Sequence, residues 1–137
     1  MSDYDQASIR SLQAELAGFQ ARMADICGIA VVDDDHAVLA TTITGQNAVQ
    51  TIAQTPALVQ LVRRLFAVFE GSVDEELILA GTLDGEMRYI IIQPIAPTLS
   101  MIVFTIPGTK VGLMRLDVHY TAQQIARWWP SQPPTQA

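Results

Sequence analysis

The residues of this sequence that come nearest to a known chemical motif are Gly108, Thr109 and Lys110. They stand between an expected strand and an expected helix, which is where a phosphate-binding loop lies. The P-loop pattern G-x-x-x-x-G-K-[ST] places its lysine before the hydroxyl residue, whereas Lys110 follows Thr109 and the earlier glycine of the pattern is missing. The sequence therefore predicts an ordinary strand-to-helix connection in which Thr109 caps the helix.

Three adjacent acids, Asp33, Asp34 and Asp35, are the second place where side chains could bind a ligand, in this case a divalent cation. An EF-hand loop alternates its acids and ends in a bidentate glutamate at its twelfth position. The twelfth position counted from Asp33 is Thr44. Because adjacent acids also point in different directions, we expect a solvated turn and no metal site.

The remaining candidate nucleophiles and bases do not form a set. Cys27 is the only cysteine and lies in a strand that the sequence predicts to be buried, where a thiol behaves as an inert apolar group. His36 falls in an expected turn and His119 in an expected helix, with no common partner. We therefore expect no catalytic residue, cofactor or metal, and predict that the chain is not an enzyme.

Composition narrows the possible partners. The chain has 137 residues, of which 50% are apolar and 16% charged, and its formal net charge is −6. An acidic protein gains nothing from neutralising phosphates, which disfavours nucleic acids and anionic membranes as partners. The longest uncharged stretch, residues 89–109, is interrupted by Pro94, Pro97 and Pro107, so we expect no membrane insertion. The acidic N-terminus is unlike a signal peptide, which predicts a cytoplasmic protein.

The length fits one domain, predicted over residues 1–129, followed by a disordered proline-rich tail over residues 130–137. Apolar periodicity and turn residues predict helices over residues 5–23, 55–70 and 111–129, and strands over residues 27–32, 37–42, 76–82, 87–93 and 99–106. The second helix is expected to begin at Thr55 and Pro56, a capping hydroxyl followed by proline. Residues 43–54 fit either a loop or the first turns of that helix.

Short connections determine how the strands pair. Asp84 and Gly85 are a strong hairpin signal, and the other turns within each group of strands are also too short for a crossover. Neighbouring strands must therefore be antiparallel. The last three strands contain apolar runs without polar alternation, which indicates strands covered on both faces. These features predict an α+β fold with three layers, α/β/α, one five-stranded antiparallel sheet, and the first and last helices on the same face.

The second helix is more apolar than a helix on the outside of a sheet needs to be. A surface helix buries a stripe about 100° wide. This one carries two apolar sides, which are Leu58, Leu61, Leu65 and Phe69, and Val59, Val62, Phe66 and Phe69. The surplus predicts that the chain associates with a second copy through this helix.

Three segments, taken in order, resemble the Roadblock (dynein light chain-type) family. Residues 27–33 follow a long amphipathic helix and are similar to the opening strand and aspartate of the family, and residues 37–40 are similar to the strand that returns. Residues 111–115 are similar to the glycine-leucine entry into the final helix. The resemblance covers residues 8–129.

Two positions depart from the family. His36 stands where relatives often have glycine, so the first hairpin turn is expected to differ in shape. The Thr55-Pro56 pair lies where relatives are already helical, so it is expected to interrupt or restart the second helix.

The resemblance implies a Roadblock/profilin-like fold and a homodimer in which the second helices pack together and the third strands join the two sheets. The residues that it places at this interface are Leu58, Leu61, Val62, Leu65 and Phe69 in the second helix and Leu77 and Leu79 in the third strand. It also implies a non-catalytic regulator or scaffold of a bacterial Ras-like small GTPase in signalling. The excess of arginine over lysine agrees with a bacterial source.

A second hypothesis is a small-molecule sensing module, since helix-covered antiparallel sheets also bind ligands. Such a domain needs a polar-lined cavity. The candidate wall offers only Tyr89, Gln93 and Thr105 among aliphatic residues. A ligand-dependent rise in melting temperature would distinguish this function from that of a scaffold.

Overall fold

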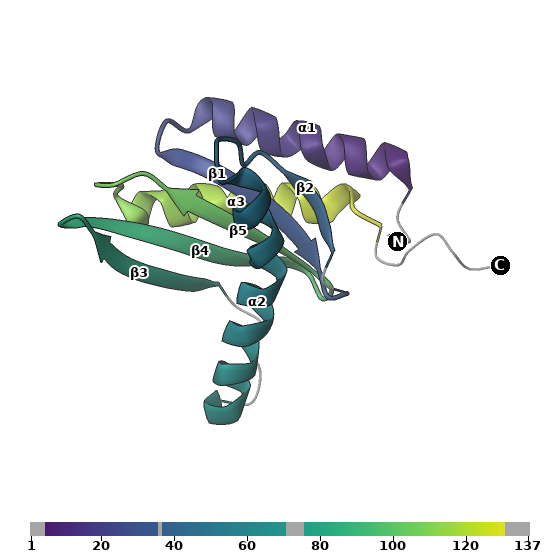
Figure 1. Cartoon of the computed structure of the whole chain (residues 1–137). Helices are drawn as coiled ribbons and strands as arrows, with labels where there is room; N and C mark the ends of the chain where they lie inside the picture. Colours follow the sequence, from purple (N-terminus) through teal and green to yellow (C-terminus); the bar gives the residue numbers. More distant parts are fainter. Residues whose placement is uncertain (1–4, 36, 71–75, 131–137) are drawn as a thin grey trace.

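The computed structural model describes residues 5–35, 37–70 and 76–130, without the side chains of Phe66, Phe69, Glu70 and Leu83. Figure 1 shows its elements, which in chain order are α1 (Gln6–Arg22), β1 (Ile26–Asp33), β2 (Val38–Thr41), α2 (Ala48–Glu70), β3 (Leu77–Leu83), β4 (Glu86–Ala96), β5 (Leu99–Thr105) and α3 (Val111–Trp128). This order of helices and strands is the predicted one. His36 and residues 131–137, which include most of the predicted tail, lie outside the described residues.

The strands form one antiparallel sheet in the order β2-β1-β5-β4-β3. The first and last strands of the chain, β1 and β5, pair in the middle of the sheet, and β2 and β3 are left at its two edges. The predicted five-stranded antiparallel sheet is confirmed. The two edges are important for function because an edge strand carries backbone N–H and C=O groups that have no strand partner.

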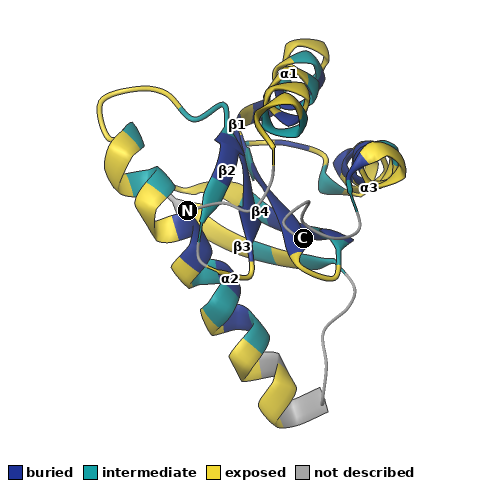
Figure 2. Ribbon diagram, turned by 90° about the vertical axis from the view of Figure 1, so that its right-hand side faces the viewer, coloured by how far each residue is buried: buried dark blue, intermediate teal, exposed yellow. Residues whose placement is uncertain are grey.

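Helices cover both faces of the sheet, as Figure 2 shows. On one face, α1 and α3 lie side by side over a core to which they contribute Leu12, Leu16, Phe19, Met114, Val118, Ala122 and Ile125. On the other face, α2 packs through Val59 and Val62 against Val32, Ile92 and Ile102 of the sheet. The predicted three layers, with the first and last helices on one face, are confirmed.

α1 begins where its first turn is capped by a side chain. Asp5 has extended backbone geometry, and its carboxylate accepts a hydrogen bond of 2.6 Å from the backbone N–H of Ser8. That bond favours the charged carboxylate and lowers the pKa of Asp5 below its ordinary value. The cap fixes the start of a helix whose buried residues recur every three or four positions.

The hairpin between β3 and β4 follows the sequence prediction. Asp84 and Gly85 both have positive φ, at 54° and 81°, as a type I′ turn requires. Leu83 pairs with Glu86 across this two-residue turn. β4 then continues through Ala96 rather than ending near Gln93, so the turn to β5 is shorter than expected.

The predicted start of the second helix at Thr55 is wrong, because α2 already begins at Ala48 and Pro56 lies inside it. Of the two alternatives for residues 43–54, first helical turns are correct from Ala48 onward. A proline has no N–H, so the carbonyl of Ile52, four residues earlier, loses its helical donor. The hydroxyl of Thr55 donates to that carbonyl at 2.8 Å. Thr55 and Pro56 resemble a helix start in the sequence, but in the structure the Thr55 hydroxyl replaces the hydrogen bond that Pro56 removes from the helix interior.

α2 extends past its own sheet. Figure 1 shows that its last turns project away from the strands, and Figure 2 shows that this end is largely exposed. Earlier in the helix, Val59 and Val62 are buried against the sheet, and the Arg63 guanidinium donates to the hydroxyl of Ser100 in β5. On the half of this sheet face that β3 and β4 form, Ile92 packs against α2, whereas Leu79 and Ile90 stay partly exposed.

Candidate functional site

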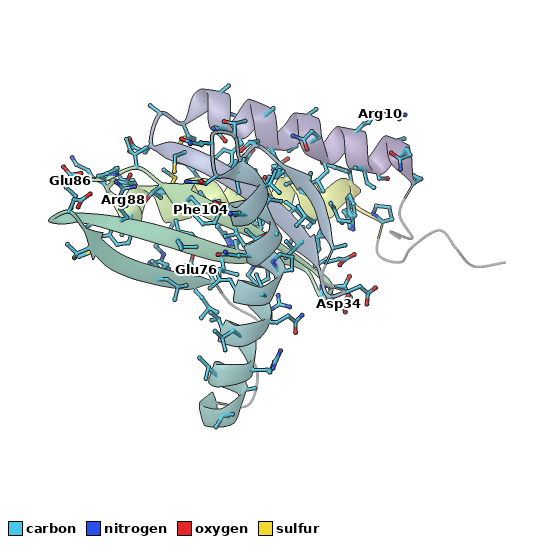
Figure 3. All side chains as sticks on the ribbon, viewed as in Figure 1. Arg10, Asp34, Glu76, Glu86, Arg88 and Phe104 are labelled. Carbon is cyan, nitrogen blue, oxygen red and sulfur yellow. The ribbon has the colours of Figure 1, made fainter. Side chains whose placement is uncertain are left out.

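The acidic residues do not gather at one place. Figure 3 shows Asp34 and Glu86 at opposite ends of the sheet. Among the described residues, no group of three or more His, Cys, Asp and Glu side chains could hold a metal ion. Asp33 is buried in the turn, where its Oδ1 accepts hydrogen bonds from the N–H groups of Asp35 at 3.0 Å and Ala37 at 2.9 Å. The predicted solvated turn is therefore wrong for Asp33, whose buried carboxylate shapes the turn, and right for Asp34 and Asp35, which are exposed.

The connection before α3 differs in detail from its prediction. Lys110, not Thr109, is the capping residue, and its side chain makes no cap hydrogen bond. The hydroxyl of Thr109 instead donates backwards to the carbonyl of Ile106 at 2.7 Å. Thr109 is therefore wrong as the predicted cap, because its hydroxyl stabilises the turn that precedes the helix.

Cys27 is exposed rather than buried, contrary to the sequence prediction. The pairing of β1 with β5 shifts by a residue between Ile26 and Gly28, and this bulge turns the Cys27 side chain out of the sheet. Partial loss of hydration raises the pKa of the thiol, so it stays protonated and weakly nucleophilic at neutral pH. His119 is exposed on α3.

The clearest unused bonding capacity in the described structure is the free edge of β3. The residues on either side of a two-residue turn, here Leu83 and Glu86, form a hydrogen-bonded pair, and such pairs alternate along an antiparallel ladder. Alternate residues of β3 therefore direct both backbone groups away from the sheet. These residues are Ile78, Ala80 and Thr82.

β3 also lacks the features that usually protect an edge strand. Native edges are commonly guarded by lysine, proline or a bulge, but β3 has the sequence LILAGTL and pairs regularly with β4. Just before the strand, the Nε–H of Arg115 on α3 donates to Glu76 Oε1 at 2.6 Å. This charged pair fastens the beginning of the edge strand to the body of the chain.

Next to this edge lies an apolar region of the sheet that α2 leaves uncovered. The strand register places Leu79, Ile90 and Phe104 in one row across β3, β4 and β5. All three are only partly buried, although they adjoin the core on the α2 side. α2 contributes Leu58 and Leu61 to the groove beside this row, and Leu65 lies one turn further along the helix. We name these six residues the open face.

The exposure of α2 shows which of its sides is unpartnered. Val62 packs on the sheet and is 7% exposed, whereas Leu61 is 54% and Leu65 52% exposed. Beyond them, Val68 is 79% exposed. Large apolar side chains that are highly exposed and adjacent to one another are typical of a surface that binds another protein.

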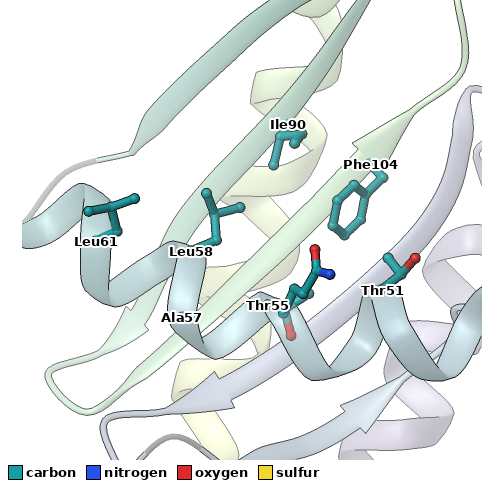
Figure 4. Close-up of a pocket in the computed structure, with 8 residues that line it drawn as sticks. Thr51, Thr55, Ala57, Leu58, Leu61, Ile90 and Phe104 are labelled. Atoms are coloured by element: carbon teal, nitrogen blue, oxygen red, sulfur yellow. The ribbon is translucent and has the colours of Figure 1, made fainter.

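A groove runs along the open face between α2 and the sheet. Figure 4 shows Leu58 and Leu61 on the helix side and Ile90 and Phe104 on the sheet side. The groove has a volume of about 430 Å³. Thr51, Gln54 and Thr55 close its end nearest the start of α2, so its walls are mainly aliphatic with few polar groups.

The predicted interface residues are distributed unequally in this arrangement. Leu58, Leu61, Leu65 and Leu79 belong to the open face. Val62 belongs to the chain's own core on the α2 side, and Leu77, like Leu58 and Leu79, is partly buried against that core. The side chain of Phe69 lies outside the described residues.

The polar wall considered for a sensing module does not form around this groove. The Thr105 hydroxyl accepts a hydrogen bond from the N–H of Tyr89 and donates to its carbonyl. Gln93 is buried, and its amide donates to the carbonyl of Pro94. These side chains point to the face that α1 and α3 cover, because they alternate with Ile90 and Ile92 along the strands.

Sequence reasoning missed Ile90, Phe104 and Gln13. The first two lie in apolar runs that predict doubly covered strands, and no signal in the runs reveals that α2 stops short of them. Gln13 bonds to Thr41 at the other edge of the sheet, and its position on the polar side of a helix carries no sign of that partner.

No family model matches the chain, and no curated protein is similar to it in sequence. Its fold is nevertheless that of solved structures. The Roadblock/LC7 domain from Streptomyces avermitilis has a TM-score of 0.60 at 17% identity, over 82% of this chain and 96% of that chain. MglB from Myxococcus xanthus has a TM-score of 0.73 at 13% identity, over 93% and 92% of the two chains. The gliding protein MglB from Thermus thermophilus has a TM-score of 0.61 at 14% identity, over 90% and 91%.

These similarities establish that the chain has the Roadblock/LC7 fold, which confirms the resemblance drawn from the sequence at the level of the fold. Among the described residues, no helix combines the length and apolarity needed to cross a membrane.

Proposed function

We propose that this Roadblock-fold chain is a non-catalytic homodimer that regulates or scaffolds a Ras-like small GTPase. The observation that carries the proposal is the unprotected edge of β3 beside the open face, two surfaces that one partner can cover at once. An exposed edge strand and an apolar patch are each a hazard in a monomer. A second copy removes both.

The edge of β3 suits pairing with itself. Its outward-facing residues, Ile78, Ala80 and Thr82, are spaced evenly about Ala80. An antiparallel pair with a two-fold axis at Ala80 brings Ile78 of one copy opposite Thr82 of the other. Every outward N–H and C=O of the strand is then paired, and the contact is the same on both sides, as a two-fold interface requires.

The open face supports the same arrangement. The projecting end of α2, with Leu65 and Val68, needs an apolar surface beyond its own sheet, and the row of Leu79, Ile90 and Phe104 needs a cover. In a two-fold dimer through β3, the projecting α2 of one copy lies near the row of the other. Stable interfaces bury about 800 Å² per partner, which strand pairing and helix packing together can reach.

The GTPase part of the proposal rests on the Roadblock resemblance and on the likeness in fold to MglB, one example of which is described as a gliding protein. A regulator without catalytic residues acts by binding one conformation of the GTPase switch loops better than another. The open grooves and exposed apolar residues fit such a binding role better than a chemical one.

The test is binding of Ras-like GTPases from the same genome, each loaded with GDP or with a non-hydrolysable GTP analogue. We expect the immobilised chain to retain one GTPase in one nucleotide state and to change its nucleotide turnover. The same GTPase in the other nucleotide state is the control. Failure to retain any of them in either state would contradict the regulatory function but not the dimer.

The groove of about 430 Å³ leaves a small-molecule sensor as the second candidate. Its aliphatic walls would take an apolar ligand. A panel of apolar metabolites should then raise the melting temperature of the chain in a concentration-dependent way. A scaffold whose groove is filled by its partner copy shows no such rise.

A further inference from the structure

At the second edge of the sheet, a side chain of α1 bonds to the backbone of β2. The Nε2–H of Gln13 on α1 donates to the carbonyl of Thr41 at 2.7 Å, and the N–H of Thr41 donates to Oε1 of Gln13 at 3.1 Å. A carboxamide that both donates to and accepts from one residue makes the two bonds that a neighbouring strand would make. The side chain therefore stands in for a strand.

Neighbouring hydrogen bonds hold this part of β2 in place. The hydroxyl of Thr41 donates to the carbonyl of Ile29 at 2.8 Å and accepts from the N–H of Ile43 at 3.1 Å. The hydroxyl of Thr42 accepts from the N–H of Ile29 at 2.9 Å and donates to Gln20 Oε1. Gln13 and Gln20, which lie about two turns apart on the same side of α1, thus connect this helix to the end of the edge strand.

The core fixes Gln13 in this position. Leu12 and Leu16, on the adjoining side of α1, are completely buried against the sheet. Beside Gln13 a groove of about 440 Å³ remains between α1 and the end of β2, and the small side chains of Ala17 and Ala21 form its helix wall. An extended segment entering this groove to pair with β2 would have to displace the Gln13 amide from Thr41.

We propose that Gln13 closes the β2 edge, so that strand pairing between copies is confined to β3 and assembly stops at two chains. In this respect the inference rests on the proposed dimer. A sheet with two open edges can add copies at both ends and grow into a filament. A sheet with one closed edge cannot.

The experiment compares Gln13→Met with Gln6→Met, an exposed glutamine in the first turn of the same helix. Methionine keeps the length and the helix propensity of glutamine but makes no carboxamide hydrogen bonds. Both variants are made in the natural chain and in Ala80→Pro, whose proline removes an outward N–H from the other edge. Sedimentation velocity over a hundredfold range of concentration gives the masses.

We expect the natural chain and Gln6→Met to form the same two-chain species at all higher concentrations. Gln13→Met should form larger species whose mass grows with concentration. In the Ala80→Pro background, Gln13→Met should associate more strongly, through β2, than Ala80→Pro alone does. Identical mass distributions for Gln13→Met and its parent in both backgrounds would overturn the closure by Gln13. A monomeric natural chain would instead overturn the dimer through β3.

Hydrogen exchange at the Thr41 amide provides a second measurement at concentrations where no association occurs. Loss of one hydrogen bond should speed its exchange by about fivefold to tenfold in Gln13→Met and leave it unchanged in Gln6→Met. Gln13→Glu, which can accept from Thr41 but not donate to it, serves if the methionine variant does not fold. Unchanged exchange in the folded variant would show that the amide does not close this edge.

Discussion

β2 and β3 are edge strands of one sheet, yet they differ in length, in sequence and in what meets their free backbone groups. β2 has four residues and β3 has seven. Thr41 of β2 exchanges two hydrogen bonds with Gln13, whereas the outward groups of Ile78, Ala80 and Thr82 on β3 meet no described element. At one edge a side chain of the same chain bonds to the strand, and at the other the outward backbone groups stay open among the described residues.

The faces beside the two edges differ in the same way. Next to β2, both faces of the sheet are covered, by α1 on one side and by the start of α2 on the other. Next to β3, the α2 side is uncovered and carries Leu79 and Ile90. Hydrogen-bonding capacity and apolar surface are therefore left open at the same end of the sheet, and this coincidence is the physical argument for one large interface.

Leu65→Asp should have the largest effect, because it places a carboxylate in the centre of the apolar contact. An unpaired charge removed from water costs several kcal/mol, so the dissociation constant should rise by at least about a hundredfold. Sedimentation equilibrium measures the change. Ala67→Asp is the control, since it adds the same charge about 200° further around the helix. Equal dissociation constants for Leu65→Asp and Ala67→Asp would show that the interface does not lie at the open face.

Ala80→Pro should weaken association less than Leu65→Asp. It removes the N–H at the proposed two-fold axis but leaves the ladder to β4 intact, because that N–H points outward. Loss of the central pair, at about 1 kcal/mol for each hydrogen bond, predicts a dissociation constant about tenfold to a hundredfold higher. Ala80→Val keeps the N–H and should associate as the natural chain does. A dimer unaffected by the proline would show that β3 does not join the sheets.

Thr55→Val should lower the free energy of unfolding by about 1–2 kcal/mol, because the carbonyl of Ile52 loses the donor that replaces the missing N–H of Pro56. The effect falls on α2, the helix on the open side. Urea denaturation at a fixed protein concentration measures it. In a Pro56→Ala background the backbone donor is restored, so the same substitution should cost almost nothing. Equal costs in both backgrounds would contradict the role given to the hydroxyl.

Asp5→Ala should have the smallest effect, and it falls on α1, the helix that closes β2. The folded state lowers the pKa of Asp5 from 3.8 through the bond with Ser8, so the carboxylate stabilises the fold above that pH. This stabilisation is lost as the pH falls through the lowered value. The melting temperatures of the variant and the natural chain should thus differ at pH 7, and the difference should shrink as the pH falls well below 3.8. Asp5→Asn keeps a cap that carries no charge, so its melting temperature should stay above that of Asp5→Ala at both low and neutral pH.

Most of the fold could be predicted because its determinants are local. The positive-φ turn at Asp84 and Gly85 dictates one hairpin, and the spacing of Leu12, Leu16 and Phe19 dictates α1. Where two local signals conflict, the prediction failed. Thr55 and Pro56 have the same appearance at the start of a helix and inside one, and only the distance to Ile52 distinguishes the two cases.

The candidate site was less predictable because it depends on where α2 does not cover the sheet. The apolarity of α2 indicates a partner, but the sequence does not state where the helix leaves its sheet. Ile90 has the same residue type as the fully buried Ile91 beside it, and Phe104 is as apolar as the fully buried Val103. Gln13 meets a strand 28 positions later, a separation over which sequence spacing carries no information.

The projecting end of α2 also makes the stability of its last turns depend on the concentration of the protein. Its last turns keep their helical hydrogen bonds but, with Leu65 and Val68 exposed, have few contacts to hold them in a single chain. Such turns open locally at little cost unless a partner covers them. In a dimer, mass action sets that cost, and each tenfold rise in concentration adds up to about 1.4 kcal/mol per dimer. The fraction of chains with an ordered α2 end would then rise with the concentration of the protein in the cell.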